Sequence, residues 1–305
     1  MKYLLSLTAL LLAAAPLRAA GYPDELKTNG FVLGCQAYTF NRFTVFEAIE
    51  KTAYAGGKVI EFYPGQRLSP AEPTLTFGHE PGRVKAGAEA KPRPATEPLG
   101  ADEAKAVWDK VLAKCKQHGI TPVAYGVVGI PTDEAPARKI FEFAKTMGIR
   151  VINTESDKSI DMIEKLVKEF DIKVGFHDHP KRPNDESYRM WDPNYIVELT
   201  KGRDARIGSC ADIGHWVRSG LKPVDCVKIL KGRIVSAHIK DLDKPLPSGK
   251  DVHWGQGVSG VPAVLDEFRA QGFEGPLSVE YETNWETNAE DAKACIAFVA
   301  GYKKK

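Results

Sequence analysis

The chain has 305 residues, of which 43% are hydrophobic and 27% are charged, a composition typical of a globular protein with a sizeable core. Its formal net charge of +2 gives no strong positive field, which argues against a nucleic-acid partner or an anionic membrane surface. The five cysteines follow no CxxC spacing, so we interpret them as buried small apolar residues rather than as a disulfide framework.

The N-terminus has the layout of a secretory signal peptide over residues 1–20. Lys2 precedes an apolar run from Tyr3 to Ala15, and small residues follow around Ala20. The apolar run is shorter than the ~20 residues that span a bilayer. We therefore expect the signal to be removed and the mature protein to act in a periplasm or outside the cell, with no membrane contact after removal.

Strand-like and helix-like stretches then alternate through a domain that we place at residues 28–303. The first strand is predicted at 31–38, and Thr44 with Glu47 forms a capping box that opens a helix over 44–55. A second strand follows at 59–63. Residues 64–100 are rich in proline and glycine and have no sustained periodicity, so we predict a long insert loop that acts as a lid or a subunit contact.

The alternation resumes after the insert and continues to the C-terminus. A capping box of Thr287 and Glu290 is predicted to open the last helix, over 287–302. The preceding helices are predicted at 101–118, 133–147, 157–170, 193–203, 223–231 and 260–271, and the strands between them at 120–127, 149–155, 172–179, 206–212, 233–240 and 276–281. Eight such units predict a (β/α)8 TIM barrel. A doubly wound open sheet is the alternative, which the absence of GxGxxG after the first strand disfavours.

Several of these predicted strands end in an acid or a histidine. The stretch from Gly208 to Trp216 ends its apolar run at Asp212 and brings His215 close behind. Strand parity places the polar side chains together: His238 and Lys240 share the face opposite Ala237 and Ile239. In a TIM barrel such inward groups near the C-terminal strand ends form the active site.

A set of three carboxylates and one imidazole is typical of a divalent cation site. The predicted ligands are Glu155, Asp212, His238 and Glu280, and they suit Mn, Mg, Co or Zn. Buried carboxylates raise one another's pKa when no cation is present, which favours a metal over a structural ion-pair network. Lys240 could instead neutralise one of these carboxylates.

Other residues near the strand ends are candidates for catalysis and substrate contact. Histidine titrates near neutral pH, so His177, His179 and His215 could carry a proton to or from a substrate. Candidate substrate contacts at the predicted mouth are Lys240, Glu61, Trp216 and Arg218. Ordinary solvation of the cations and packing of the aromatic rings remain the alternatives.

Three stretches closely resemble the xylose-isomerase-like TIM-barrel superfamily: Asp212–Gly220, His238–Asp241 and Gly275–Glu282. They are most similar to its sugar phosphate isomerase/epimerase branch, which includes inosose dehydratases and exported relatives associated with 3-keto-sugar breakdown. The resemblance implies one divalent cation bound by a Glu, an Asp, a His and a Glu, and three of these places match Asp212, His238 and Glu280. Epimerases supply the remaining ligand from strand five, where this chain has His177. Dehydratase-like members supply it from strand four, which matches Glu155.

The resemblance implies a metal-dependent enzyme that acts on a keto-sugar through an enediolate. His177 or Glu280 would take the α-proton, and His179 or His215 would return it or protonate a leaving group. The outcome would be isomerisation or epimerisation, or else elimination or hydration by a lyase. A non-catalytic exported sugar-binding barrel and an endonuclease of the same superfamily are the alternatives. We expect a small-molecule sugar as the partner, no nucleic acid, and possible assembly of the chain into a homo-oligomer.

Overall fold

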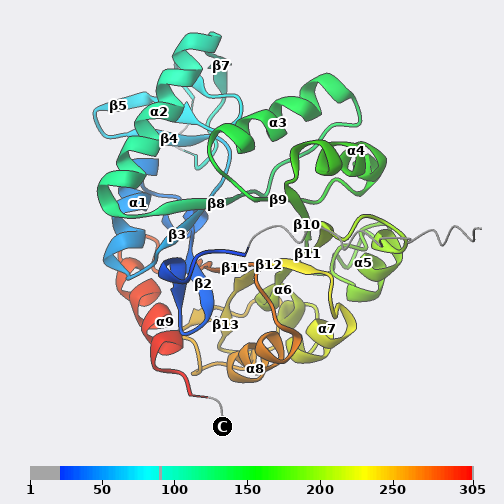
Figure 1. Cartoon of the computed structure of the whole chain (residues 1–305). Coiled ribbons are helices and arrows are strands. Elements are labelled where there is room, and N and C mark those ends of the chain that lie inside the picture. The colour runs from blue at the N-terminus through cyan, green and yellow to red at the C-terminus, as the bar shows by residue number, and fades with distance from the viewer. Residues whose placement is uncertain (1–20, 89–90, 304–305) are drawn as a thin grey trace, which may run out of the picture.

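Eight parallel strands close into a barrel in the computed structural model, which describes residues 21–88 and 91–303 (Figure 1). The signal predicted for residues 1–20 lies outside these residues. The barrel strands, in the order in which they pair, are β2 (Phe31–Gln36), β3 (Val59–Phe62), β8 (Thr121–Tyr125), β9 (Val151–Thr154), β10 (Lys173–His177), β11 (Ile207–Asp212), β12 (Ile234–Ile239) and β15 (Pro276–Val279). The last strand pairs with the first, from Pro276 opposite Val32 to Val279 opposite Cys35. The predicted (β/α)8 barrel is confirmed.

A helix follows each barrel strand in the described chain, and together the helices surround the barrel (Figure 1). They are α1 (Val45–Tyr54), α2 (Ala101–His118), α3 (Glu134–Thr146), α4 (Ile160–Phe170), α5 (Pro193–Thr200), α7 (Pro223–Ile229), α8 (Val261–Gln271) and α9 (Ala289–Gly301). Helix α4 shows why they form, because Ile160, Ile163 and Val167 recur at helical spacing and are buried. The apolar side chains on the outer face of the strands pack against such helix faces and make the main core.

The interior of the barrel contains a layer of polar side chains beneath its C-terminal end. Glu61 on β3 accepts hydrogen bonds from Asn153 on β9, at 2.7 Å, and from Gln36 on β2, at 3.4 Å. The Ser236 hydroxyl donates to Asn153 at 2.8 Å, and the Ser278 hydroxyl to Glu61 at 3.4 Å. These residues come from five strands, so the network joins distant parts of the chain and supports whatever lies above it.

The two predicted capping boxes have different outcomes. The first is present: Thr44 caps α1, its side chain accepts from the Glu47 amide, and the Glu47 carboxylate accepts from the Thr44 amide. The second prediction is wrong, because α9 begins one residue later than a Thr287 cap requires. Asn288 precedes that helix, and its side-chain amide donates to the carbonyls of Thr39 and Tyr281 instead. Tertiary contact therefore overrides the local cap signal.

The insert after β3 is a small sheet rather than the loop predicted for residues 64–100. Its antiparallel strands are β4 (Gln66–Ser69), β5 (Glu72–Phe77), β6 (Gly82–Val84) and β7 (Thr96–Pro98). Figure 1 shows this sheet beside α1 and α2. The Gln66 side chain donates to the carbonyls of Phe40 and Phe43, and Phe77 packs on Phe62 of the barrel with ring centroids 4.9 Å apart. The insert is thus fixed to the barrel wall.

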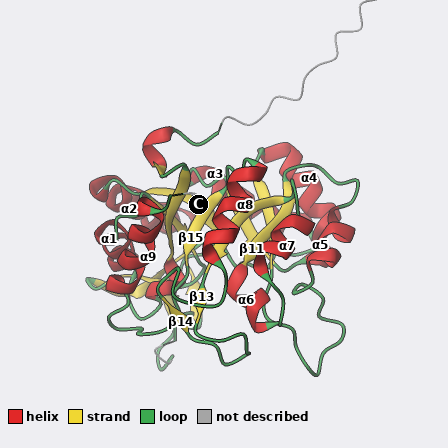
Figure 2. Cartoon of the chain, turned by 90° about the horizontal axis from the view of Figure 1, so that it is seen from below, coloured by secondary structure: helices red, strands yellow, loops and turns green. Residues whose placement is uncertain are grey.

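Short elements that sequence periodicity did not predict complete the fold. They are α6 (Ile213–Arg218), β1 (Lys27–Thr28), the hairpin of β13 (Asp241–Leu242) and β14 (Asp251–Val252), and the 3-10 helices η1 (Asp24–Leu26), η2 (Ala37–Phe40) and η3 (Asp157–Ser159). Figure 2 shows the hairpin and long loops gathered at one end of the barrel. All five cysteines lie in the described part and are buried and unpaired, as predicted. Among the described residues, no helix has both the length and the apolar character needed to cross a membrane.

Candidate active site

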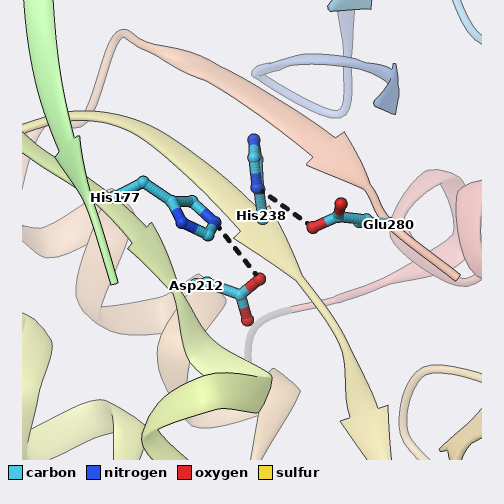
Figure 3. Close-up of side chains that lie close together, drawn as sticks. All are labelled: His177, Asp212, His238 and Glu280. Atoms are coloured by element: carbon cyan, nitrogen blue, oxygen red, sulfur yellow. Dashed lines mark ion pairs between the residues drawn. The ribbon is translucent and has the colours of Figure 1, made fainter. Parts of the chain in front are cut away.

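Four buried side chains meet at the C-terminal ends of adjacent barrel strands (Figure 3). His177 ends β10, Asp212 ends β11, His238 lies on β12, and Glu280 directly follows β15. Parallel pairing sets Asp212 opposite His238, so neighbouring strands deliver the groups at one level. One nitrogen or oxygen atom from each residue lies within 4.8 Å of the others. The four residues, called the strand-end cluster below, could bind a metal ion.

The chemistry of the strand-end cluster fits a divalent cation. Both ring nitrogens of His177 and the Nδ1 atom of His238 are buried without a hydrogen bond, although His238 Nδ1 lies 3.1 Å from Glu280 Oε2. His177 Nε2 lies 3.7 Å from Asp212 Oδ2, which is too long for a hydrogen bond. Buried nitrogens without partners are costly, and a cation between them and the carboxylates would satisfy them. Two imidazoles and two carboxylates suit a first-row transition metal such as zinc, manganese or cobalt.

Lys240 lies between the two carboxylates of the strand-end cluster. Its Nζ atom is 2.5 Å from Asp212 Oδ2 and 2.5 Å from Glu280 Oε2, and the side chain is buried. Burial alone would raise the pKa of both acids. The Lys240 ammonium and the neighbouring imidazoles outweigh burial and hold both pKa values below their usual range. Lys240 thus neutralises the carboxylates of Asp212 and Glu280, which was the alternative role that the sequence analysis gave it.

The glycine in the stretch after β11 is explained by this lysine. Asp212 caps α6, because its side chain accepts a hydrogen bond from the His215 amide at 3.0 Å. Gly214 lies in the first turn of α6, against the aliphatic part of Lys240. A Cβ atom at this position would lie 2.6 Å from Lys240 Cβ, which is closer than side chains pack. A side chain here would therefore push Lys240 away from Asp212.

Glu61 lies behind His238 rather than in the substrate cavity. Its Oε2 atom is 2.9 Å from His238 Nε2, and only 1% of the residue is exposed. A carboxylate that accepts from one ring nitrogen directs the other nitrogen toward the ligand position, here Nδ1 toward Glu280 at 3.1 Å. Glu61 was predicted to contact the substrate, but the structure places it beneath the strand-end cluster, where it supports His238.

The structure places Glu155 beside the strand-end cluster, in a second group with His177 and His179. Glu155 Oε1 contacts His179 Nδ1 and lies 3.7 Å from His177 Nδ1. His177 takes the fourth place next to Asp212, His238 and Glu280, where Glu155 was expected. Burial raises the pKa of Glu155, but the two imidazoles outweigh it and lower that pKa to about 2.

A cavity of about 700 Å³ opens over these groups. Of the predicted site residues, five line it: Glu155, His177, His179, His215 and Glu280. Sequence reasoning missed further lining residues, among them Gln36, Tyr38, Arg93 and Glu282. Gln36 shares the inward parity of β2 and could have been found by the alternation used for the other strands. Arg93 could not, because it comes from the insert.

His215 is held in one tautomer by a neighbouring arginine. Arg218 Nη1 lies 3.2 Å from His215 Nδ1, and a guanidinium can only donate, so Nδ1 accepts. Burial keeps the pKa of His215 well below its usual range, so the ring is neutral and its proton is on Nε2. That nitrogen lies 3.6 Å from Asp212 Oδ2. His215 therefore offers an N–H group beside the strand-end cluster.

None of the four predicted substrate contacts lines the cavity, and the two not yet described are Trp216 and Arg218. Trp216 is buried in the hydrophobic core with 1% of its surface exposed. Arg218 pairs with Glu282 at 3.5 Å and Asp251 at 3.7 Å. Asp178, which sequence reasoning did not single out, accepts a hydrogen bond from the Asp212 amide at 2.8 Å and so fixes the end of β11. These residues support the site from its edges.

A closed barrel of eight parallel strands with helices between them is the architecture of a known family. The chain belongs to the family described as Xylose isomerase-like TIM barrel, which matches residues 84–299. No curated protein sequence matches the chain.

Solved structures of similar fold span nearly the same length. An uncharacterized protein from Parabacteroides distasonis is 29% identical, with a TM-score of 0.64 over 88% of this chain and 98% of that one. The probable 3-DHS dehydratase AsbF of Bacillus anthracis is 13% identical, with a TM-score of 0.60 over 88% and 98%. The IOLI protein, solved with a zinc atom, is 17% identical, with a TM-score of 0.57 over 88% and 97%. At these lower identities the likeness concerns the fold.

Proposed function

We propose that the protein is a divalent-metal-dependent enzyme that moves a proton at the carbon next to the carbonyl of a keto-sugar. The observation that carries the proposal is the strand-end cluster, where two buried imidazoles with unpaired nitrogens face two buried carboxylates beneath an open cavity. The family relation supports it, since structural neighbours include a probable dehydratase and a zinc-containing protein. Isomerases, epimerases and carbon-oxygen lyases that act on a keto-sugar all remove this proton, so the proposal covers these three classes of reaction.

The strand-end cluster would hold the cation through His177 Nε2, Asp212, His238 Nδ1 and Glu280. A bound divalent ion supplies a Lewis acid that polarises the substrate carbonyl and stabilises the charge left when the α-proton departs. Lys240 keeps Asp212 and Glu280 ionised, since its ammonium lies against both. Lys240 also prevents the two carboxylates from repelling each other in the protein without an ion.

Proton transfer is assigned to the cavity residues beside the strand-end cluster. The Glu155 and His179 pair is partly exposed to the cavity, and the ionised carboxylate can orient the imidazole and stabilise its protonated form, so His179 is suited to take the α-proton. His215 is neutral and carries its proton on Nε2, so it can donate a hydrogen bond to a substrate oxygen. His177 and Glu280, expected as bases from the sequence, are the ligands in this scheme. The compartment we propose is the periplasm or the outside of the cell, because the sequence of residues 1–20 has the pattern of a secretory signal.

The experiment combines metal binding with isotope exchange. The purified protein is stripped with a chelator, reloaded with Mn²⁺ or Zn²⁺, and incubated with 3-keto-glucosides in deuterium oxide. We expect deuterium at the carbon next to the carbonyl, and a mass change if a leaving group is eliminated. Glu155→Gln should bind the ion and lose exchange, whereas Asp212→Asn should lose both.

The controls separate catalysis from binding alone. Glu142→Gln, an exposed position on α3, should retain ion binding and exchange. Saturable sugar binding with no isotope exchange and no product, whichever of these ions is loaded, would identify a non-catalytic sugar-binding barrel. It would reject the proposal that the protein is an enzyme. Full exchange by the chelator-treated protein would reject the metal.

A further inference from the structure

The insert contributes a cationic side chain to the cavity of the barrel. Arg93 lies in the segment between β6 and β7 and lines the same cavity as His177 and Glu280. Its guanidinium lies 5.6 Å from the centre of the Tyr63 ring, and Nη2 donates to the Val127 carbonyl at 3.3 Å. These contacts hold the charge of Arg93 at the rim of the cavity.

The carboxylates that line the cavity have partners of opposite charge or imidazole partners, whereas Arg93 has no carboxylate partner in the described part of the chain. Each lining carboxylate already has a cationic or imidazole partner: Glu280 has Lys240 at 2.5 Å, Glu282 has Lys240 and Arg218 at 3.5 Å, and Glu155 has His179. Arg93 has no carboxylate within 4.0 Å among residues 21–88 and 91–303. An exposed arginine fork without an acid, at the rim of a binding cavity, is suited to a ligand carboxylate or phosphate.

The wall beside Arg93 is aromatic. Tyr38 and Tyr63 pack edge to face with ring centroids 5.3 Å apart, and Trp285 packs on Tyr38 at 6.1 Å. Tyr38 and Tyr63 both line the cavity. Flat aromatic surface next to a cation can contact the carbon face of a sugar ring while the cation takes a charged substituent.

We propose that the cavity selects a sugar that carries an anionic group, a carboxylate or a phosphate, and that Arg93 is the residue that recognises it. The proposal rests on the proposed function for the position of the sugar carbonyl at the strand-end cluster. It adds the substrate class, an acidic rather than a neutral sugar. The insert thereby becomes a specificity element of the enzyme.

The test measures binding rather than turnover. Isothermal titration calorimetry of the Mn²⁺-loaded full-length protein is performed with D-glucuronate, D-glucose 6-phosphate and D-glucose. We expect at least one anionic sugar to bind about tenfold more tightly than glucose, the effect of one charge-assisted hydrogen bond. The sugar that shows the preference distinguishes a carboxylate from a phosphate substrate. In Arg93→Gln the preference should disappear, and in Arg93→Lys it should be partly retained.

Arg83→Gln is the matched control. Arg83 lies in β6 of the same insert and pairs with Glu103 at 3.1 Å, away from the cavity, so its removal should leave the preference unchanged. Equal binding of all three sugars, no binding of either anionic sugar, or a preference that survives in Arg93→Gln would overturn the proposal. None of these results would affect isotope exchange on a neutral keto-sugar, so the two proposals fail separately.

Discussion

One buried carboxylate, Glu61, supports a histidine of the strand-end cluster from behind. Its Oε2 atom lies 2.9 Å from His238 Nε2, whereas the partly exposed Glu155 stays 3.7 Å from His177 Nδ1, too far for a hydrogen bond. The other ring nitrogen of His238, Nδ1, points toward the position between the cluster residues. A carboxylate in this place fixes the tautomer of the histidine and raises its basicity as a ligand.

Replacing Glu61 with glutamine should weaken metal binding without unfolding the barrel. The amide keeps the size of the carboxylate but removes the charge that orients His238, so we expect Kd for Mn²⁺ or Zn²⁺ to rise about 10- to 100-fold. Calorimetric titration of the chelator-treated variant measures it, with Glu142→Gln as the control. An unchanged Kd would show that Glu61 is structural filling only.

Asp251 should make stability depend on pH in a direction opposite to that of most acids. Burial is the main cause that raises the pKa of Asp251 to about 7, against 3.8 as the ordinary value. Between these values the folded state holds a proton that the unfolded state has lost. The stability contributed by Asp251 is therefore present below about pH 4 and is lost as the pH rises to 7.

Asp251→Asn should remove this dependence. Its free energy of unfolding relative to the wild type should increase by up to about 1.4 kcal/mol per pH unit from pH 4 to pH 7, since the amide does not titrate. Chemical denaturation at pH 4.5, 6 and 8 gives the three points. Parallel curves for the two proteins would contradict the raised pKa.

The sequence predicted those site residues that can be recognised from one strand at a time. Asp212, His238 and Glu280 each ended a strand with the right parity, and the structure brings them together. The choice between Glu155 and His177 required the lateral distance between β9 and β10, which alternation does not encode. Lys240 was visible as an inward cation, but only the fold shows that it reaches two carboxylates at once.

At the scale of elements, local sequence patterns did not predict the strands of the insert sheet. Its strands are three to six residues long, and β5 and β7 contain proline. The alternation of polar and apolar residues is therefore too short to identify them as strands. The sheet is held by a few tertiary contacts instead. Gln66, 1% exposed, is the main polar one, because its amide satisfies two carbonyls of the segment that leads into α1.

Gln66→Leu should loosen the insert while the barrel stays folded. Two hydrogen bonds are lost, and the buried carbonyl of Phe40 and the partly buried carbonyl of Phe43 become unsatisfied, which should cost about 2 kcal/mol. Limited proteolysis should then cut within residues 64–100 faster than in the wild type, and the effect of Arg93 on ligand binding should weaken. Gln117→Leu, at an exposed position of α2, serves as the comparison. Identical proteolysis of both variants would show that Gln66 does not anchor the insert.

For the whole molecule, the alternation of buried strands and amphipathic helices was enough to predict the barrel. Strands such as β11 are buried along their full length, which is typical of parallel strands covered on both faces. Eight repeats of such a unit leave few ways to bury every strand, and closure is one of them. The fold was therefore predictable from repetition, whereas the insert and the hairpin of β13 and β14 each occur once and have no repeat to reveal them.

Ion binding should stabilise the whole barrel, because the strand-end cluster joins four adjacent strands, β10, β11, β12 and the end of β15. An ion that binds only the folded state adds about 2.7 kcal/mol at a free concentration of 100 times its Kd. The midpoint of thermal unfolding should therefore rise when Mn²⁺ or Zn²⁺ is added to the chelator-treated protein and fall again with EDTA. Amide hydrogen exchange should slow most in these four strands and least in the insert. Asp212→Asn should abolish the shift, since the remaining cluster loses the carboxylate that lies nearest His177. A midpoint that does not move with any of the transition metals would mean that Lys240 alone supplies the cation of this site.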